Sequence, residues 1–288
     1  MTSLLRLLRI EQWLKNLFLF VPLFFAGDLF NFEGLITLLI GFFIFSLIAS
    51  SIYIFNDFKD IKLDRLHPVK RNRPLASGKV SVREALILAA VLLASGLCFS
   101  YLLNWQFFTI ILVYVTLNIL YSMGLKNISI VDIFIISFGF ILRILAGGIL
   151  VGVAVSHWLL IMIFLLALFL VLAKRRDDLI VQLTISSTIR KTSSTYNLEF
   201  INSCLTIFSG IIVVAYIMYT LSSEVTSRLN SNLFITTIFV LAGIMRYLQI
   251  TFVDQKSGSP TKILIKDKFI ILTILCWIIS FYIIIYAL

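Results

Sequence analysis

Residues 35–64, LITLLIGFFIFSLIASSIYIFNDFKDIKLD, give the strongest indication of the fold. Their first part, residues 35–55, carries no charged side chain, and three aspartates follow directly in residues 56–64. About 20 mostly apolar residues are needed to cross the hydrocarbon core of a bilayer as an α-helix. Because a helix satisfies its backbone hydrogen bonds internally, we predict that residues 35–55 form a transmembrane helix ending in an acidic segment.

The rest of the chain repeats this apolar pattern. Hydrophobic residues make up 60% of the sequence and charged residues only 13%, which is too little polar surface for a soluble domain of this length. We therefore predict an all-α membrane protein with one domain over residues 1–288. Its nine expected spans lie at roughly 11–27, 35–55, 84–103, 106–123, 130–151, 157–173, 200–221, 232–251 and 269–287.

The basic residues are distributed unevenly among the predicted loops. The net charge is +10, and Lys and Arg concentrate at the N-terminus and after the second, fourth, sixth and eighth spans. The other loops contain a single basic residue, Arg228; these loops lie near 28–34, 104–106, 152–156 and 222–231. Cytoplasmic loops carry the excess of Lys and Arg, so we expect a cytoplasmic N-terminus, an outside C-terminus and residence in the inner (cytoplasmic) membrane. This distribution argues against a nucleic-acid partner.

Asp57, Asp60 and Asp64 are the first candidate catalytic residues. If the helix continues past Phe55, their spacing places them within an arc of about 60° on one helical face. Carboxylates so close would repel one another unless a cation lay between them. Magnesium takes oxygen ligands and is commonly completed by substrate phosphates, so we predict a Mg²⁺ site here, with Asn56 beside it. The alternative is a solvated helix end whose acids are neutralised by neighbouring Lys and Arg.

Basic residues follow the acidic segment in a predicted active-site loop at about 56–83. Lys70, Arg71 and Arg73 are suited to phosphate oxygens, and the planar guanidinium group can bind them bidentately. Their positions next to the acids predict a diphosphate site, although membrane topology alone would also place cations here. His67 is interpreted as a structural or phosphate-contacting residue.

A second acidic pair, Asp177 and Asp178, follows the sixth span, within a second predicted loop at about 174–199. The pair is a candidate for a second magnesium ion or a sugar hydroxyl. Lys174 stands four residues before Asp178, so an ordinary ion pair on a helix surface explains the pattern as well. Lys174 and Arg175 are candidate substrate-binding residues.

Polar residues also occur inside the predicted spans. Arg143 lies about 16 Å deeper along its helix than Asp132, and Lys15 and Asn16 lie one turn inside the first span. Ionisable groups at such depth are costly and usually face a cavity or a partner. We expect these four residues to line a polar cavity that holds substrate.

The segment NDFKDIKLD, residues 56–64, resembles the first signature of the UbiA superfamily, Asn-Asp-x-x-Asp-x-x-x-Asp. The resemblance covers essentially the whole chain, with an acidic segment after the second helix and another after the sixth. It implies a bundle of nine transmembrane helices around a central cavity, acids that bind a diphosphate through Mg²⁺, and a long polyprenyl chain in the cavity.

Three further stretches resemble one branch of the superfamily, the decaprenyl-phosphate phosphoribosyltransferases. They are RIEQWLKNLFLF (9–20), DRLHPVKRNRPLASG (64–78) and YSMGLKNISIVDIFIISFGFILRILAGG (121–148). The third adds Tyr121 and Lys126 to the candidate substrate-binding residues. The aromatic-acceptor branch usually has His-x-Lys-Arg-Thr-x-x-Arg-Pro where this chain has HPVKRNRP. The segment KRRDDL, residues 174–179, is closer to the Lys-Arg-rich loop of the phosphoribosyl branch than to the Asp-Arg-x-Asp-Asp run of the aromatic-acceptor branch. It departs from the phosphoribosyl loop in its Asp-Asp, where that loop more often ends in Glu.

The resemblance implies a Mg²⁺-dependent transferase that moves 5-phosphoribose from phosphoribosyl diphosphate to a polyprenyl phosphate and releases pyrophosphate. One alternative is a polyprenyltransferase that joins prenyl diphosphate to 4-hydroxybenzoate. A second is a membrane transporter, which the position of the acids in loops and not at the membrane midplane disfavours. The expected partners are these substrates and the lipid bilayer, with a homo-oligomer as an open possibility.

Overall fold

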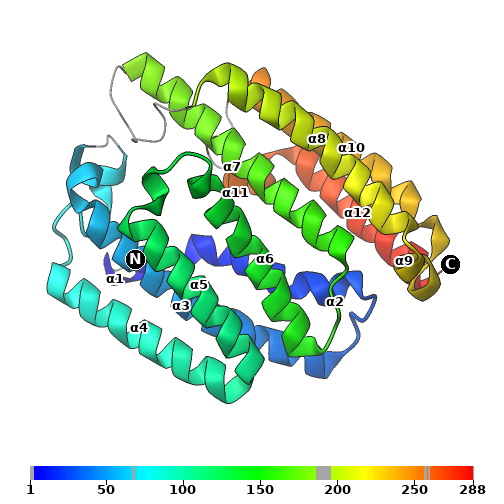
Figure 1. The fold of residues 1–288 in the computed structure, drawn as a ribbon, viewed down its shortest axis with the longest axis horizontal. Helices are drawn as coiled ribbons and strands as arrows, with labels where there is room; N and C mark the ends of the chain where they lie inside the picture. The colour runs from blue at the N-terminus through cyan, green and yellow to red at the C-terminus, as the bar shows by residue number, and fades with distance from the viewer. Residues whose placement is uncertain (1–2, 67–68, 186–195, 256–257, 259, 288) are drawn as a thin grey trace. The chain divides into compact units, whose positions relative to one another are not determined.

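The computed structural model describes residues 3–66, 69–185, 196–255, 258 and 260–287, and these residues contain helices and no strand (Figure 1). The chain divides into two compact units. Unit 1 comprises residues 1–135 and 139–155, and unit 2 comprises residues 136–138 and 156–288. The expectation of one domain over residues 1–288 stays a prediction.

Unit 1 contains four long helices and several short elements. The long helices are α3 (Phe32–Leu66), α4 (Val82–Leu103), α5 (Trp105–Met123) and α6 (Val131–Val151). The short elements are α1 (Ser3–Leu7), η1 (Ile10–Phe20), α2 (Val21–Phe25), η2 (Lys70–Asn72) and η3 (Leu125–Asn127). Local signals set several of the helix ends. Ser81 and Glu84 form a reciprocal capping box at the start of α4, and the Asn104 side chain accepts two backbone N–H bonds at the start of α5.

Unit 2 is built mainly from α7 (His157–Ile185), α8 (Leu198–Leu221), α10 (Thr237–Phe252) and α12 (Lys268–Tyr286), with α9 (Ser223–Arg228), η5 (Ser231–Thr236) and α11 (Pro260–Lys266) between them. Helix α7 packs along α8, and α10 packs along α12. The buried hydroxyl of Tyr216 shares a 2.6 Å hydrogen bond with Thr236 and accepts one of 2.8 Å from the Trp277 indole. This bond network joins α8, η5 and α12.

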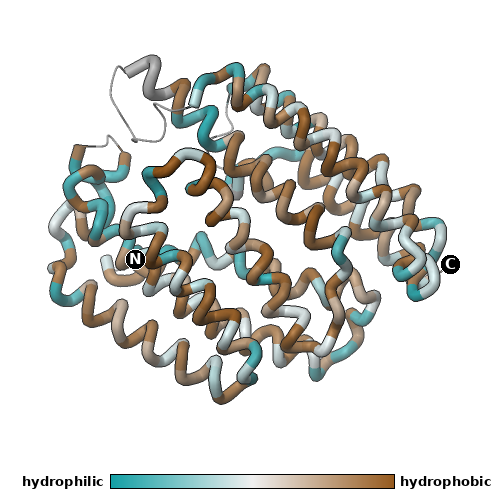
Figure 2. The backbone as a smooth tube through the Cα atoms, in the orientation of Figure 1, coloured by the Kyte–Doolittle hydropathy of each residue, from teal (hydrophilic) through white to brown (hydrophobic). Residues whose placement is uncertain are grey.

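Eight helical segments in the described part of the chain are long and apolar enough to cross a membrane. They coincide with the second to ninth predicted spans, which confirms those positions. Figure 2 shows hydrophobic residues along the helices and hydrophilic residues mostly at their ends and in the connections. Many large apolar side chains point outward, such as Leu102 and Met245, as expected for helices that face lipid.

The first predicted span, residues 11–27, differs from the others. It consists of the 3₁₀-helix η1, 11 residues long, followed by the five-residue helix α2. Such a long 3₁₀-helix is uncommon, since the form usually occurs in runs of three or four residues. At about 2.0 Å per residue in η1 and 1.5 Å in α2, the two elements together extend about 30 Å, close to the thickness of the hydrocarbon core. The count of nine spans is therefore not confirmed by helix length, and it stays a prediction.

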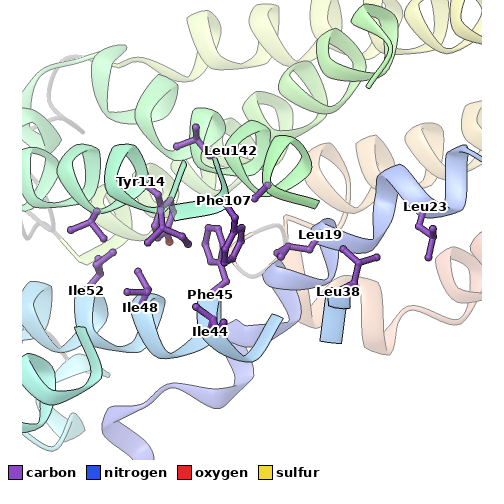
Figure 3. Packing of buried hydrophobic residues seen from close by; sticks show 13 residues of the cluster. Leu19, Leu23, Leu38, Ile44, Phe45, Ile48, Ile52, Phe107, Tyr114 and Leu142 are labelled. Atoms are coloured by element: carbon purple, nitrogen blue, oxygen red, sulfur yellow. The ribbon is translucent and has the colours of Figure 1, made fainter. Parts of the chain in front are cut away.

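The core of unit 1 forms where η1, α3, α5 and α6 meet. Phe45 of α3 packs against Tyr114 of α5 with a ring-centroid distance of 4.7 Å, and Figure 3 shows both rings beside Phe107. Leu19 of η1 is fully buried in the same cluster. A Cβ atom on Gly147 of α6 would lie 2.0 Å from the Leu19 carbonyl oxygen. The backbones of η1 and α6 therefore touch, and only glycine fits at position 147.

Helix α3 is longer than a membrane is thick. Its 35 residues extend about 52 Å, against about 30 Å of hydrocarbon. The helix thus continues past Phe55 to Leu66, which is the condition under which Asp57, Asp60 and Asp64 share one helical face. Residues 56–66 are helical and not part of the predicted loop. Residues 174–185 likewise continue α7. The helical part of each predicted active-site loop is what orients its aspartates.

Candidate functional site

The C-terminal end of α3 carries three aspartates in unlike surroundings. Asp57 and Asp64 are 2% and 4% exposed, whereas Asp60 is half-buried. Burying a carboxylate is unfavourable unless it is paired and hydrogen-bonded. Each of the three is accordingly paired with a basic side chain from elsewhere in unit 1. Neutralisation by neighbouring cations, an alternative considered above, is thus what the structure contains.

Arg73 joins the two most buried of these three carboxylates. Its Nη1 atom donates hydrogen bonds of 3.0 Å to Asp57 Oδ1 and 2.6 Å to Asp64 Oδ2. The segment that carries Arg73 is firmly packed, because Leu75 and Val80 are buried in an apolar cluster with Ile54 of α3. One positively charged nitrogen therefore bridges two carboxylates seven residues apart on α3.

Arg9 is a site residue that the sequence analysis attributed only to topology. Its guanidinium group forms a hydrogen bond and ion pair with Asp57 and lies 5.3 Å from the centre of the Tyr53 ring. The backbone of Arg9 is left-handed, with φ +50°. A non-glycine residue rarely adopts this conformation, and such residues gather at functional sites. No local pattern in the sequence predicts the contact between Arg9 and Asp57, because 48 residues separate them.

The connection between α5 and α6 supplies the third basic residue. Lys126 in η3 pairs with Asp60, 66 residues away in sequence. Nearby, Ser122 Oγ lies 3.3 Å from Asn56 Oδ1, to which it donates a hydrogen bond. The structure thus brings Lys126 and Ser122 to the acidic end of α3, where Asn56 also lies. Tyr121 is half-buried in the last turn of α5.

The donor set at the end of α3 suits a divalent cation. Among the described residues, no three or more His, Cys, Asp or Glu side chains are grouped closely enough to share a metal ion. Magnesium, however, commonly binds to one or two carboxylates and completes its shell with water and substrate phosphates. Asp57 and Asp64 already hold one cationic nitrogen between them, so a Mg²⁺ ion shared by these two carboxylates fits. It would compete with the Arg73 guanidinium group.

A second polar group of unit 1 lies deeper among the helices, around Arg143. This side chain is 4% exposed and donates hydrogen bonds to Asn16 Oδ1 at 2.8 Å and the Tyr114 hydroxyl at 2.9 Å, and to the Gly139 carbonyl at 2.7 Å. Asn16 in turn donates to Ser46 Oγ of α3. The structure thus brings Arg143 and Asn16 together, and the cavity that they were expected to line stays a prediction. Asp132 is fully buried in the first turn of α6.

The acidic pair of unit 2, Asp177 and Asp178, lies on α7. Asp178 pairs with Arg175 three residues earlier in α7, at 3.3 Å. An ion pair within α7 is thus present between Arg175 and Asp178, and the neighbouring Lys174 side chain is exposed. A Cβ atom on Gly258 would lie 2.0 Å from Asp177 Oδ2, so the connection between α10 and α11 rests on that carboxylate.

Arg176 was not among the predicted site residues. It donates hydrogen bonds to Asn202 Oδ1 at 2.8 Å and the Thr251 carbonyl at 2.6 Å. These bonds join α7 to α8 and to the C-terminal end of α10, where a positive charge is favourable. Its role is structural.

The segment after α3 contains three further predicted site residues: His67, Lys70 and Arg71. Lys70 is half-buried in η2 and Arg71 beside it is exposed, so neither shares the buried position of the carboxylates that Arg73 contacts. His67 lies outside the described residues.

Comparison with known proteins assigns the family. A model of the UbiA prenyltransferase family matches residues 17–274. The chain belongs to this family. The match spans most of both compact units and confirms the resemblance found in the sequence: this is a UbiA-family transferase and a multi-pass membrane protein.

Two relatives in the UbiA family align with nearly the whole chain and share one name, and a third aligns with a shorter part. Decaprenyl-phosphate phosphoribosyltransferase of Mycolicibacterium smegmatis is 31% identical, over 96% of this chain and 90% of that protein. The protein of the same name from Corynebacterium glutamicum is 30% identical, over 96% and 84% respectively. Digeranylgeranylglyceryl phosphate synthase of Sulfurisphaera tokodaii is 35% identical, but over only 39% of this chain and 40% of the relative.

Solved UbiA structures have the same fold. A UbiA homologue from Archaeoglobus fulgidus, bound to GPP and Mg²⁺, superposes with a TM-score of 0.72 at 21% identity, covering 98% of this chain and 99% of that one. A UbiA homologue from Aeropyrum pernix gives a TM-score of 0.68 at 16% identity, covering 94% and 98%. These likenesses confirm the predicted all-α membrane fold.

Proposed function

We propose that this UbiA-family protein transfers 5-phosphoribose from phosphoribosyl diphosphate to a polyprenyl phosphate and releases pyrophosphate. The observation that carries the proposal is the group of three aspartates and three basic residues at the end of α3. It is supported by relatives named decaprenyl-phosphate phosphoribosyltransferase that match 96% of the chain.

The proposed donor site combines opposite charges. Arg9, Arg73 and Lys126 provide positive groups beside Asp57, Asp60 and Asp64, and we assign Asn56, Lys70, Arg71 and Tyr121 to the same substrate site. A Mg²⁺ ion held by the aspartates would neutralise charge on the diphosphate. The guanidinium group of Arg73 would then be available to phosphate oxygens, to which it binds more strongly than a neutral donor.

The reaction needs little proton transfer. A phosphate oxygen of the acceptor, already ionised at neutral pH, attacks the anomeric carbon as the bond to the diphosphate breaks, so the bonding electrons leave with pyrophosphate. No general base is required. The basic residues stabilise the charge that develops on the leaving group. Direct displacement inverts the configuration at the anomeric carbon.

Other predicted residues complete the proposal. We assign Lys15, Asn16, Asp132 and Arg143 to the part of the protein that receives the acceptor, and Lys174, Arg175, Asp177 and Asp178 to a further substrate-contacting group of unit 2. We also propose residence in the inner membrane with a cytoplasmic N-terminus. A reporter fused after Leu288 should then report the outside face, and a cytoplasmic signal would contradict this orientation.

One assay tests the reaction. Purified protein in lipid vesicles is incubated with Mg²⁺, radiolabelled phosphoribosyl diphosphate and a polyprenyl phosphate, and a parallel sample receives prenyl diphosphate and 4-hydroxybenzoate. The proposal predicts labelled sugar in the lipid phase, in the wild type and not in Asp57→Asn. Prenylated 4-hydroxybenzoate without labelled lipid would instead place the chain in the aromatic-acceptor branch.

A further inference from the structure

The 3₁₀ geometry of η1 sorts its side chains into three rows, because residues three apart eclipse one another in such a helix. Trp13, Asn16 and Leu19 form the row that packs inward, and its two polar members are hydrogen-bonded to Ser50 and Ser46 of α3. The opposite row contains Leu14 and Leu17, both exposed. The third row, between the inward row and the exposed row, is half-buried and contains Gln12, Lys15 and Phe18.

Arg143 is fully engaged by the protein. All three of its guanidinium nitrogens donate hydrogen bonds to protein oxygens. Its charge also lies 4.9 Å from the ring centres of both Phe45 and Tyr114, a distance at which a cation is attracted to an aromatic face. A substrate could reach this guanidinium group only by breaking bonds that hold η1, α5 and α6 together.

Lys15 of η1 differs from Arg143 in lacking a hydrogen-bond acceptor among the described residues. Within the described part of the chain its ammonium group makes no hydrogen bond or ion pair, and two further cations, Arg143 and Arg9, lie within electrostatic range. A cation in a half-buried, largely apolar setting is unfavourable unless an anion pairs with it, and the positive charges of Arg143 and Arg9 add to that cost. An anion bound to Lys15 would offset it.

The depth of Lys15 indicates what kind of anion fits. Lys15 lies between two anchors of η1 on α3: Trp13 on Ser50 and Asn16 on Ser46. Along the helix these anchors lie about 10–16 Å from Asp57, on the side of the apolar span. The row next to Lys15 on the outer side includes the exposed Leu14 and Leu17. An anion here therefore meets an apolar surface that would accommodate an attached hydrocarbon chain.

We propose that Lys15 is the residue that binds the phosphate of the lipid acceptor, a phosphate monoester on a long apolar chain. Asn16 and Arg143 are positioning residues that hold η1 so that Lys15 stays in place. Arg9, the residue before η1, pairs with Asp57 at the donor site. The inference rests on the proposed function and specifies where one of its two substrates binds.

The test compares Lys15→Met with Lys62→Met. Met has nearly the length of Lys without its charge, and Lys62 is an exposed lysine on the same unit. Binding of a polyprenyl phosphate, the corresponding uncharged polyprenol and phosphoribosyl diphosphate is measured for each protein in nanodiscs. Lys15→Met should weaken polyprenyl phosphate binding roughly 10- to 150-fold, the range for losing a hydrogen bond to a charged group. Polyprenol and donor binding should stay within about twofold, and Lys15→Arg should recover part of the loss.

Thermal unfolding provides a second readout. Without lipid phosphate, Lys15→Met should unfold at the wild-type temperature or above it, because an unpaired cation has been removed. Added polyprenyl phosphate should raise the unfolding temperature of wild type and Lys62→Met but not of Lys15→Met. Arg143→Met should instead lower it with or without lipid, since three protein acceptors lose their donor.

The outcomes separate this inference from the proposed function. A wild type that transfers phosphoribose, with Lys15→Met binding polyprenyl phosphate equally well, overturns the inference and leaves the function. Equal weakening of donor and acceptor binding also overturns it, because Lys15 would then hold the donor diphosphate. A wild type that neither binds polyprenyl phosphate nor transfers phosphoribose overturns the function and the inference with it.

Discussion

The acidic segments of the two units differ in how their charges are paired. On α3 of unit 1, Asp57 pairs with Arg9, 48 residues away, as well as with Arg73, and Asp60 pairs with Lys126, 66 residues away. On α7 of unit 2, Asp178 pairs with Arg175, three residues earlier on the same helix. A local pair of this kind contributes only a few tenths of a kcal/mol to a helix. Paired acids in a sequence can therefore mark a site built by the whole fold or an ordinary feature of a helix surface.

The largest expected loss of turnover follows a substitution at Asp57 of α3. Replacing Asp57 with Asn should lower turnover by about 1,000-fold or more, because it removes a charge that organises Arg9 and Arg73 and would bind Mg²⁺. Steady-state transfer assays measure the loss, with protein amount and unfolding temperature as controls. Wild-type turnover in this variant would remove the α3 acids from the mechanism.

Gly147 should show the largest effect on stability. A Cβ atom there would lie 2.0 Å from a backbone oxygen of η1, which cannot move aside as a flexible side chain could. Gly147→Ala should therefore destabilise the protein by about 3 kcal/mol and displace η1. Thermal unfolding in detergent measures this. Normal stability would mean that η1 and α6 can separate without penalty.

Arg73 allows a test of whether the α3 site holds both a metal ion and a phosphate group. Arg73→Ala should raise the KM for the diphosphate donor about 30-fold through a lost charge-assisted contact. The same change should tighten Mn²⁺ binding to the substrate-free protein, since the guanidinium group no longer bridges Asp57 and Asp64. Electron paramagnetic resonance titration measures the second effect. Unchanged Mn²⁺ affinity would show that arginine and metal do not compete.

Asp178 in unit 2 should respond more weakly than Asp57. Its carboxylate is half-buried and pairs with Arg175 three residues earlier on the same helix. We expect Asp178→Asn to change turnover less than about tenfold, as measured in the same assay. A loss equal to that of Asp57→Asn would show that the local pairing conceals a catalytic role.

The smallest expected effect is a gain in stability at Gly210 in α8. A Cβ atom at this position would meet no heavy atom within 4 Å, and Ala favours a helix over Gly. Gly210→Ala should stabilise the protein by about 0.5–1 kcal/mol. It is the matched control for Gly147→Ala, and a loss of stability here would mean that glycine substitution in any span is harmful.

The sequence alone determined the helical spans and the arrangement of the acids. Apolar runs of sufficient length predict eight of the observed segments, and the spacing of Asp57, Asp60 and Asp64 predicts their common helical face. These features depend on the period of one helix and on hydrogen bonds within it, so a local pattern contains them. The motif at 56–64 and the later stretches also sufficed to place the chain in its family.

Only the tertiary structure decided which charges meet and which stay apart. The left-handed backbone of Arg9 and the 3₁₀ geometry of η1 depend on packing against α3 and α6. Arg143 meets Asn16 across 127 residues of sequence, while Lys15, next to Asn16, meets no acceptor in the described part of the chain. Such contacts arise between helices, and their geometry depends on how side chains fill the space between them. A single sequence read along its length contains no signal for them.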